Sequence, residues 1–83
     1  MLSVSQAINI VKKYIPQGDI QSAIEYDGLY IFMVFDNDAL EGQMDTFYSV
    51  DIQTGEFRDF SIITDGNISE INSLFLNDPI YKS

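Results

Sequence analysis

The sequence predicts one α+β domain over residues 1–83: an N-terminal helix, an antiparallel meander of three or four strands, and a short C-terminal helix packed on one sheet face. Three observations predict this architecture. A capped amphipathic segment stands near each end, strand-patterned segments lie between them, and the tight-turn signals Asp27-Gly28 and Thr54-Gly55 join neighbouring strands. Because each helix must bury an apolar stripe, we expect both to cover the same face of the sheet.

The N-terminal helix begins after Ser3, because Ser3 and Gln6 have the spacing of a capping box. Lys12 and Lys13 stand in its last turn, where cations complement the helix dipole, and Pro16 ends it. Its apolar residues recur at helical spacing and form the stripe expected in the core: Val4, Ala7, Ile8, Val11, Tyr14 and Ile15.

Four segments between the helices have strand patterns. Residues 20–26 alternate in polarity, Asp27-Gly28 supplies a two-residue hairpin turn, and residues 29–35 are apolar on both faces, which predicts a central strand. Residues 46–52 and 57–63 form the third and fourth strands around Thr54-Gly55. The apolar residues of the fourth strand do not alternate strictly, so we expect a β-bulge near Asp59.

The C-terminal helix is predicted from the capping spacing of Asn67 and Glu70, and Asp78-Pro79 ends it. The four residues that follow are expected to fray. The apolar stripe of this helix comprises Ile68, Ile71, Leu74 and Phe75.

The composition argues against most enzyme classes. The chain contains no Cys and no His, which removes thiolate chemistry, the commonest general base and the commonest metal ligand. Lys12 and Lys13, as alternative bases, have no Ser at motif spacing, and the five glycines stand singly at turns. We therefore expect no enzyme, no catalytic residues and no cofactor.

Charge indicates the kind of partner. The chain contains thirteen acidic and four basic residues, and its formal net charge is −9. Such a surface repels nucleic acid and anionic lipid and attracts basic proteins. The alternative explanation is that the negative charge only keeps the protein soluble. Residues 36–45 are the most acidic loop, but Leu40 and Glu41 break the calcium-loop pattern, so we expect no metal site. The residues expected to contact a protein partner are Asp36, Asp38, Glu41, Asp45, Arg58, Tyr30, Phe32 and Tyr48.

The apolar character of residues 29–35 raises the question of self-association. If both helices cover one face, the other face exposes an aromatic and aliphatic patch that monomers rarely leave bare. One alternative is a symmetric homodimer that buries this patch. The other is a monomer in which tyrosine hydroxyls and the long loop keep the patch hydrated. The patch would include Tyr30, Phe32, Val34, Tyr48 and Phe60.

The expected location is the cytoplasm. The first residues, Met-Leu-Ser-Val-Ser-Gln, place no basic region ahead of an apolar run, so we expect no signal peptide. The longest apolar run, residues 29–35, is much shorter than the roughly 20 residues that span a bilayer.

Two resemblances bear on function. Residues 47–57 (FYSVDIQTGEF), preceded by a helix that ends in Lys-Lys-Tyr-Ile-Pro, resemble the PepSY-like modules of bacterial proteins across residues 4–60. That resemblance implies a helix on a three-stranded antiparallel sheet and a binding or inhibitory role without catalytic residues. The chain departs from it at the acidic loop and the C-terminal helix. Residues 47–62 are also similar to small uncharacterised phage and prophage proteins of Gram-positive bacteria, which implies a phage context in host cytoplasm or virion.

These observations predict a phage or prophage accessory protein that acts by protein–protein contact, in particle assembly or on a host protein. The alternative is an acidic inhibitor or immunity protein that neutralises a basic toxin, nuclease or DNA-binding protein by charge mimicry.

Overall fold

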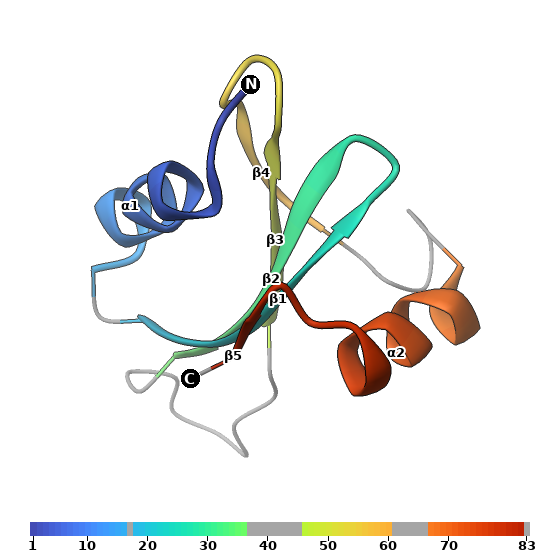
Figure 1. Cartoon of the computed structure of the whole chain (residues 1–83). Coiled ribbons are helices and arrows are strands. Elements are labelled where there is room, and N and C mark those ends of the chain that lie inside the picture. The colour runs from blue at the N-terminus through green and yellow to red at the C-terminus, as the bar shows by residue number, and fades with distance from the viewer. Residues whose placement is uncertain (17, 37–45, 61–66, 83) are drawn as a thin grey trace.

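The computed structural model describes residues 1–16, 18–36, 46–60 and 67–82. Its sheet is antiparallel throughout, with strand order β4-β3-β2-β1-β5 (Figure 1). The predicted α+β class and the meander of consecutive strands are confirmed. The elements are α1 (Val4–Tyr14), β1 (Gly18–Tyr26), β2 (Leu29–Asp36), β3 (Thr46–Asp51), β4 (Phe57–Asp59), α2 (Ile68–Asn77) and β5 (Tyr81–Lys82).

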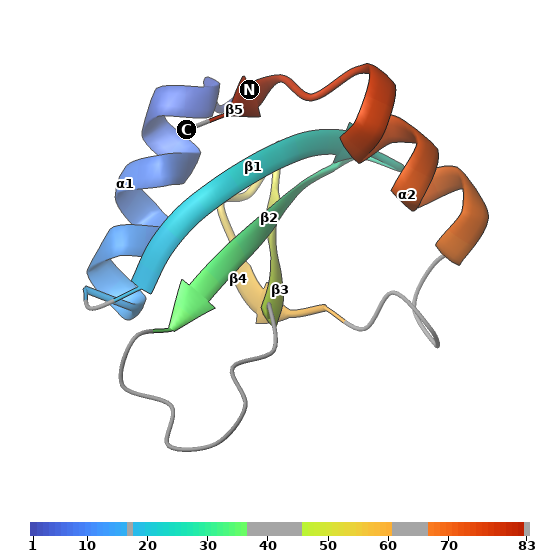
Figure 2. The same ribbon diagram turned by 90° about the horizontal axis from the view of Figure 1, so that it is seen from below.

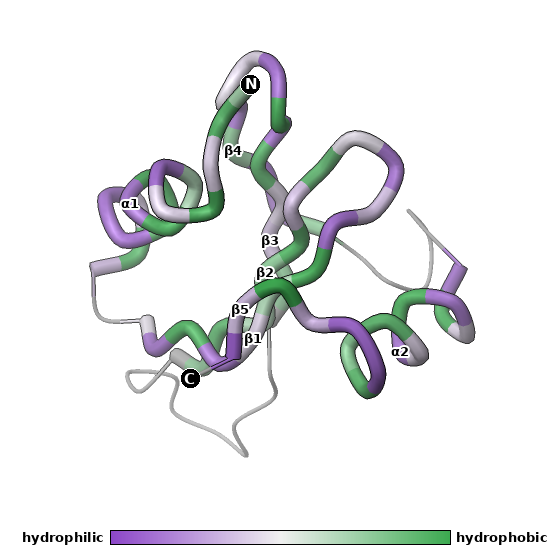
Figure 3. The backbone as a smooth tube through the Cα atoms, in the orientation of Figure 1, coloured by the Kyte–Doolittle hydropathy of each residue, from purple (hydrophilic) through white to green (hydrophobic). Residues whose placement is uncertain are grey.

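The helix starts follow the local sequence. The Ser3 hydroxyl accepts the Gln6 backbone N–H at 3.2 Å, and the Gln6 side chain accepts the Ser3 N–H at 2.8 Å, which completes the predicted capping box. At α2 the Asn67 side chain accepts the Glu70 N–H at 3.0 Å. Both helices are amphipathic, with hydrophobic and hydrophilic stretches alternating along each (Figure 3).

The helices pack on opposite faces of the sheet, so the prediction that they share one face is wrong (Figures 1 and 2). Ile31 and Phe32 are consecutive in β2, so their side chains point to opposite faces. Phe32 packs with Val11 of α1 in one core cluster, whereas Ile31 packs with Ile71 of α2 in the other. The sheet is therefore the middle layer of three, and β2 is buried on both faces, as its apolar composition requires.

A β-bulge lies in β1, between Ile20 and Ser22, and not near Asp59. The three residues of β4 pair with β3 in regular register. Because the extra residue changes which side chains face α1, Ile20 and Ala23 pack in the α1 cluster and Ile24 packs in the α2 cluster.

The last strand was not predicted. Instead of fraying, Tyr81 and Lys82 pair with Ala23 and Ser22 of β1. The Ile80 N–H donates to the Ala23 carbonyl at 2.8 Å, and the Ser22 hydroxyl donates to the Tyr81 carbonyl at 3.1 Å. These bonds tie the C-terminal segment to the free edge of β1.

The β1–β2 turn gives a clean test of backbone conformation. Asp27 and Gly28 have φ values of 50° and 77°, as the predicted two-residue turn requires. A Cβ built on Gly28 would meet no atom within 4 Å, so the cost of Gly28→Ala is conformational.

We expect Gly28→Ala to lower the free energy of unfolding by about 1–2 kcal/mol, measured by denaturant titration. Gly28→Asn should lose less, because Asn tolerates this region better. A Gly28→Ala variant with the stability of the wild type would contradict the positive φ of this residue.

Candidate functional site

The predicted contact residues do not come together as expected. Tyr30 and Phe32 are 8% and 0% exposed and belong to the α1 core, so their predicted role at the surface is wrong. The Tyr30 hydroxyl donates to the Leu2 carbonyl at 2.9 Å, which satisfies it inside the fold. Asp38, Glu41 and Asp45 lie outside the described residues, and so does the side chain of Asp36.

Tyr48 and Arg58 lie on opposite faces of the sheet, because Tyr48 alternates with Ser49, the residue that pairs with Arg58. Half-buried Tyr48 belongs to a ladder of rings on the α1 side. Its ring stacks on Phe57 at a centroid distance of 5.3 Å, and Phe57 stacks on Tyr14 at 4.6 Å. Arg58 is exposed at the sheet edge.

The exposed sheet patch expected from the sequence is absent. Val34 and Phe60 are 1% and 9% exposed, besides the buried Tyr30 and Phe32. The expected patch is missing because α1 and α2 cover different faces of the sheet. Neither sheet face is therefore exposed at the centre of β2. A homodimer stays a prediction, and it would need a different surface.

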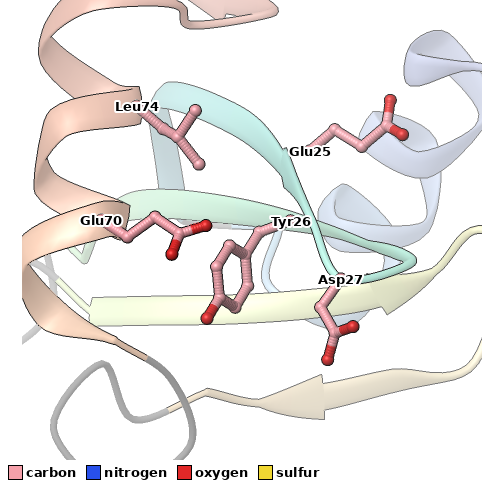
Figure 4. A pocket seen from close by; sticks show the side chains of 5 residues that line it. All are labelled: Glu25, Tyr26, Asp27, Glu70 and Leu74. Atoms are coloured by element: carbon pink, nitrogen blue, oxygen red, sulfur yellow. The ribbon is translucent and has the colours of Figure 1, made fainter.

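A cleft that was not predicted lies between the β1–β2 turn and α2, and we call it the acidic groove (Figure 4). Its volume is about 510 Å³. The Asn67 N–H donates to the Tyr26 hydroxyl at 3.4 Å and so links the start of α2 to the end of β1. The groove is lined by Glu25, Tyr26, Asp27, Glu70 and Leu74.

Three carboxylates and no base line the acidic groove. In Figure 4, Glu70 reaches from α2 toward the Tyr26 ring, Asp27 lies beyond that ring on the turn, and Glu25 points away from it. The sequence shows that Asp27 is in a turn and Glu70 in the first turn of a helix. Their proximity depends on which face α2 covers, and no local pattern indicates that.

A second, smaller hollow lies on the α2-side face of β2, β3 and β4, and we call it the serine pocket. Its volume is about 280 Å³. At its rim the Arg58 guanidinium contacts the Glu56 carboxylate at 2.7 Å through Nη2 and at 2.8 Å through Nε. The serine pocket is lined by Leu29, Ser49, Asp51, Glu56 and Arg58.

Asp51 organises the turn beside the serine pocket. Its Oδ1 accepts the Thr54 and Gln53 N–H groups at 2.9 and 2.8 Å. These hydrogen bonds, that of Thr54 foremost, hold the pKa of the Asp51 carboxyl below its ordinary value of 3.8, and the Arg58 charge adds to the effect. The charged form is therefore favoured by folding.

This lowered pKa predicts a pH dependence of stability. The contribution of charged Asp51 is present above the unfolded-state pKa near 3.8 and is lost as pH falls through the lower folded-state pKa. Asp51→Asn keeps the acceptor oxygen and removes the charge. The melting temperature of wild type should exceed that of the variant at about pH 6, and the difference should shrink below about pH 4. A difference that stays constant down to about pH 2 would contradict this role.

Within the described ranges, no group of three or more His, Cys, Asp or Glu residues is arranged to hold a metal ion. In the same part of the chain, no helix combines the length and apolar character needed to cross a membrane.

Comparisons of the chain with protein-family models, curated proteins and solved structures gave no match. The resemblances to PepSY-like modules and phage proteins therefore stay predictions.

Proposed function

We propose that this chain is a non-enzymatic binding protein that works by contact with a basic surface of another protein. One observation carries the proposal: the acidic groove brings together carboxylates from two elements more than forty residues apart, with no base among its lining residues. A Lys or Arg side chain entering it would meet negative charge from both walls.

The charge of the whole chain supports the same proposal. With a net charge of −9, the protein attracts a basic partner from a distance and orients it during the encounter. At physiological salt this attraction extends over roughly 8 Å, so short-range contacts in the groove must supply the specificity. Helices cover both faces of the sheet at the centre of β2, so the apolar sheet patch that would favour a different mode of contact is buried.

The first setting for such contact is a phage or prophage accessory protein acting in particle assembly or on a host protein. The similarity of residues 47–62 to phage and prophage proteins supports this setting.

The acidic groove also favours a second candidate, an acidic inhibitor or immunity protein. A row of carboxylates can occupy the basic site that a toxin, nuclease or DNA-binding protein offers to phosphates. The second candidate requires that the chain displace DNA from its partner, whereas an assembly protein has no such requirement. Neighbouring capsid and tail genes would support the first setting, and a neighbouring toxin gene the second.

Salt dependence tests the charge-driven mode. The probe is an N-acetylated, C-amidated hexalysine peptide carrying a fluorophore, with a labelled glycine–serine hexapeptide as the uncharged control. We expect the anisotropy-derived affinity for hexalysine to fall at least about tenfold between 50 and 500 mM NaCl. The control peptide should not bind. An affinity that is insensitive to salt would reject charge-driven contact.

A further inference from the structure

The β1–β2 turn holds a carboxylate and a backbone N–H that the fold leaves to solvent. Asp27 and Gly28 are both exposed, and Figure 4 shows the Asp27 side chain projecting from the turn. Within the described ranges, neither the Asp27 carboxylate nor the Gly28 N–H has a hydrogen-bond partner. A Cβ built on Gly28 would meet no atom within 4 Å, so the space beside this residue is open as well. The two groups belong to adjacent residues and are accessible together.

A carboxyl group and the backbone nitrogen of the next residue can condense to a five-membered ring. The Gly28 nitrogen attacks Cγ of Asp27, whose carboxyl has taken a proton from solvent. A C–N bond forms, and the carboxyl hydroxyl leaves with the amide proton as water, which gives a succinimide. Water then adds to one of the two ring carbonyls and breaks its C–N bond. Opening at one carbonyl restores aspartate, and opening at the other gives isoaspartate, whose main chain runs through Cβ and Cγ.

The residue that follows the aspartate decides how readily the ring closes. Glycine lacks a Cβ, so nothing crowds its nitrogen and the main chain turns easily into the attacking geometry. Aspartate precedes glycine at two positions of the chain, 27 and 65. Asp65 lies outside the described residues, whereas Asp27 is a described aspartate with this neighbour.

Asp51 shows how the fold protects an aspartate in a turn. Its Oδ1 accepts the Gln53 and Thr54 N–H groups at 2.8 and 2.9 Å, which holds the carboxylate in place. The N–H of the next residue, Ile52, donates to the Gly28 carbonyl at 3.2 Å. Both groups that would have to react are therefore engaged, and the nitrogen belongs to a β-branched residue.

Each remaining aspartate whose side chain the structure describes lacks another condition. The N–H that follows Asp59 donates to a β3 carbonyl at 3.0 Å. Asp78 precedes a proline, which has no N–H to lose. Asp19 precedes Ile20, a β-branched residue that is 5% exposed. In none of these three does an accessible carboxyl stand next to an accessible N–H.

We infer that Asp27 is a site of spontaneous isoaspartate formation in the folded protein, with water as the sole co-reactant. Isoaspartate adds one methylene to the main chain of a two-residue turn. It also keeps the negative charge but moves it, at one of the carboxylates that line the acidic groove. The modification itself is independent of the proposed function, whereas any effect on binding to basic proteins rests on it.

Peptide mapping of the aged full chain tests the inference. The folded protein is incubated at physiological temperature in mildly acidic buffer and digested with endoproteinase Asp-N, which cleaves before aspartate and not before isoaspartate. Electron-transfer fragmentation then locates isoaspartate in the uncut fragments. We expect it to accumulate at Asp27, with none above the starting level at Asp19, Asp51, Asp59 or Asp78.

The same chain unfolded in guanidinium chloride is the reference for the rate. Exposed turns open at little cost in free energy, so isoaspartate at Asp27 should form in the folded protein within about tenfold of its rate in the unfolded chain. A larger reduction by folding, or isoaspartate that appears at Asp65 and not at Asp27, would overturn the inference.

The Asp27→Asn variant gives a second readout. Its amide is attacked by the same nitrogen and leaves as ammonia, which is faster than the loss of water from a carboxyl. The folded variant should therefore lose this amide sooner than wild type accumulates isoaspartate, and binding measurements on it require fresh protein. Asn72, an exposed asparagine followed by serine, is the internal control. A variant that keeps its amide at position 27 as long as Asn72 keeps its own would also overturn the inference.

Discussion

The Val11→Asp variant is expected to be largely unfolded at 25 °C. Val11 is 1% exposed and packs in the α1 cluster with Phe32 and Val50. None of the described residues of that cluster offers a positive charge, so a carboxylate there would be buried and unpaired, at a cost of several kcal/mol. A domain of 83 residues has roughly 5 kcal/mol of stability to lose. Circular dichroism and a denaturant titration measure the result.

Leu76→Asp is the matched control for Val11→Asp. Leu76 is also an apolar helix residue, in α2, but it is 82% exposed. The same substitution should therefore cost at most about 1 kcal/mol, part of it from a negative charge near the helix C-terminus. A Val11→Asp variant that unfolds cooperatively at the wild-type midpoint would show that α1 does not pack on the sheet.

The features that sequence predicted well are those that local interactions determine. The capping box of Ser3 and Gln6 satisfies backbone groups within one helical turn, whatever the rest of the chain does. Asp27-Gly28 adopts positive φ values because this pair tolerates them better than other residues do. The central position of β2 followed equally directly from its apolar residues on both faces.

The position of α2 could not be read from its own sequence. Its stripe, which contains Ile71 and Leu74, requires an apolar surface but does not specify which face of the sheet supplies it. The bulge in β1 adds to the problem, because it places Ile20 and Ile24 on different faces although strict alternation puts them together. The wrong face for α2 then produced the wrong expectation of an exposed patch.

The candidate sites were missed for a related reason. The sequence drew attention to the acidic loop of residues 36–45, where the acids are neighbours in the chain. The acidic groove instead joins Asp27 and Glu70, which only tertiary packing brings together. The serine pocket likewise has no sequence signal, since strand pairing brings Ser49 and Arg58 side by side.

Removing the charges of the acidic groove is expected to have the largest effect on binding. The triple variant Glu25→Gln, Asp27→Asn and Glu70→Gln keeps the shapes of these side chains and removes their charges. Asn tolerates the positive φ of position 27, and the other two side chains are exposed, so the fold should be retained. If each carboxylate contributes about 0.5–1 kcal/mol to the contact, affinity for the hexalysine peptide should fall about tenfold or more.

A second triple variant controls for total charge. Asp19→Asn, Asp59→Asn and Asp78→Asn change three exposed acids that do not line the groove. Each triple variant removes three negative charges, so the net charge rises from −9 to −6 in both. Any difference between them therefore reports the location of the charge and not its amount.

The ratio of the hexalysine dissociation constants of these two variants, measured at 150 mM NaCl, tests the central claim most directly. If the acidic groove is the contact surface, the groove variant should bind at least about fivefold more weakly than the control variant, which should remain close to wild type. Equal losses of affinity in the two variants would contradict the claim, because they would show that the protein attracts basic partners by its total charge alone.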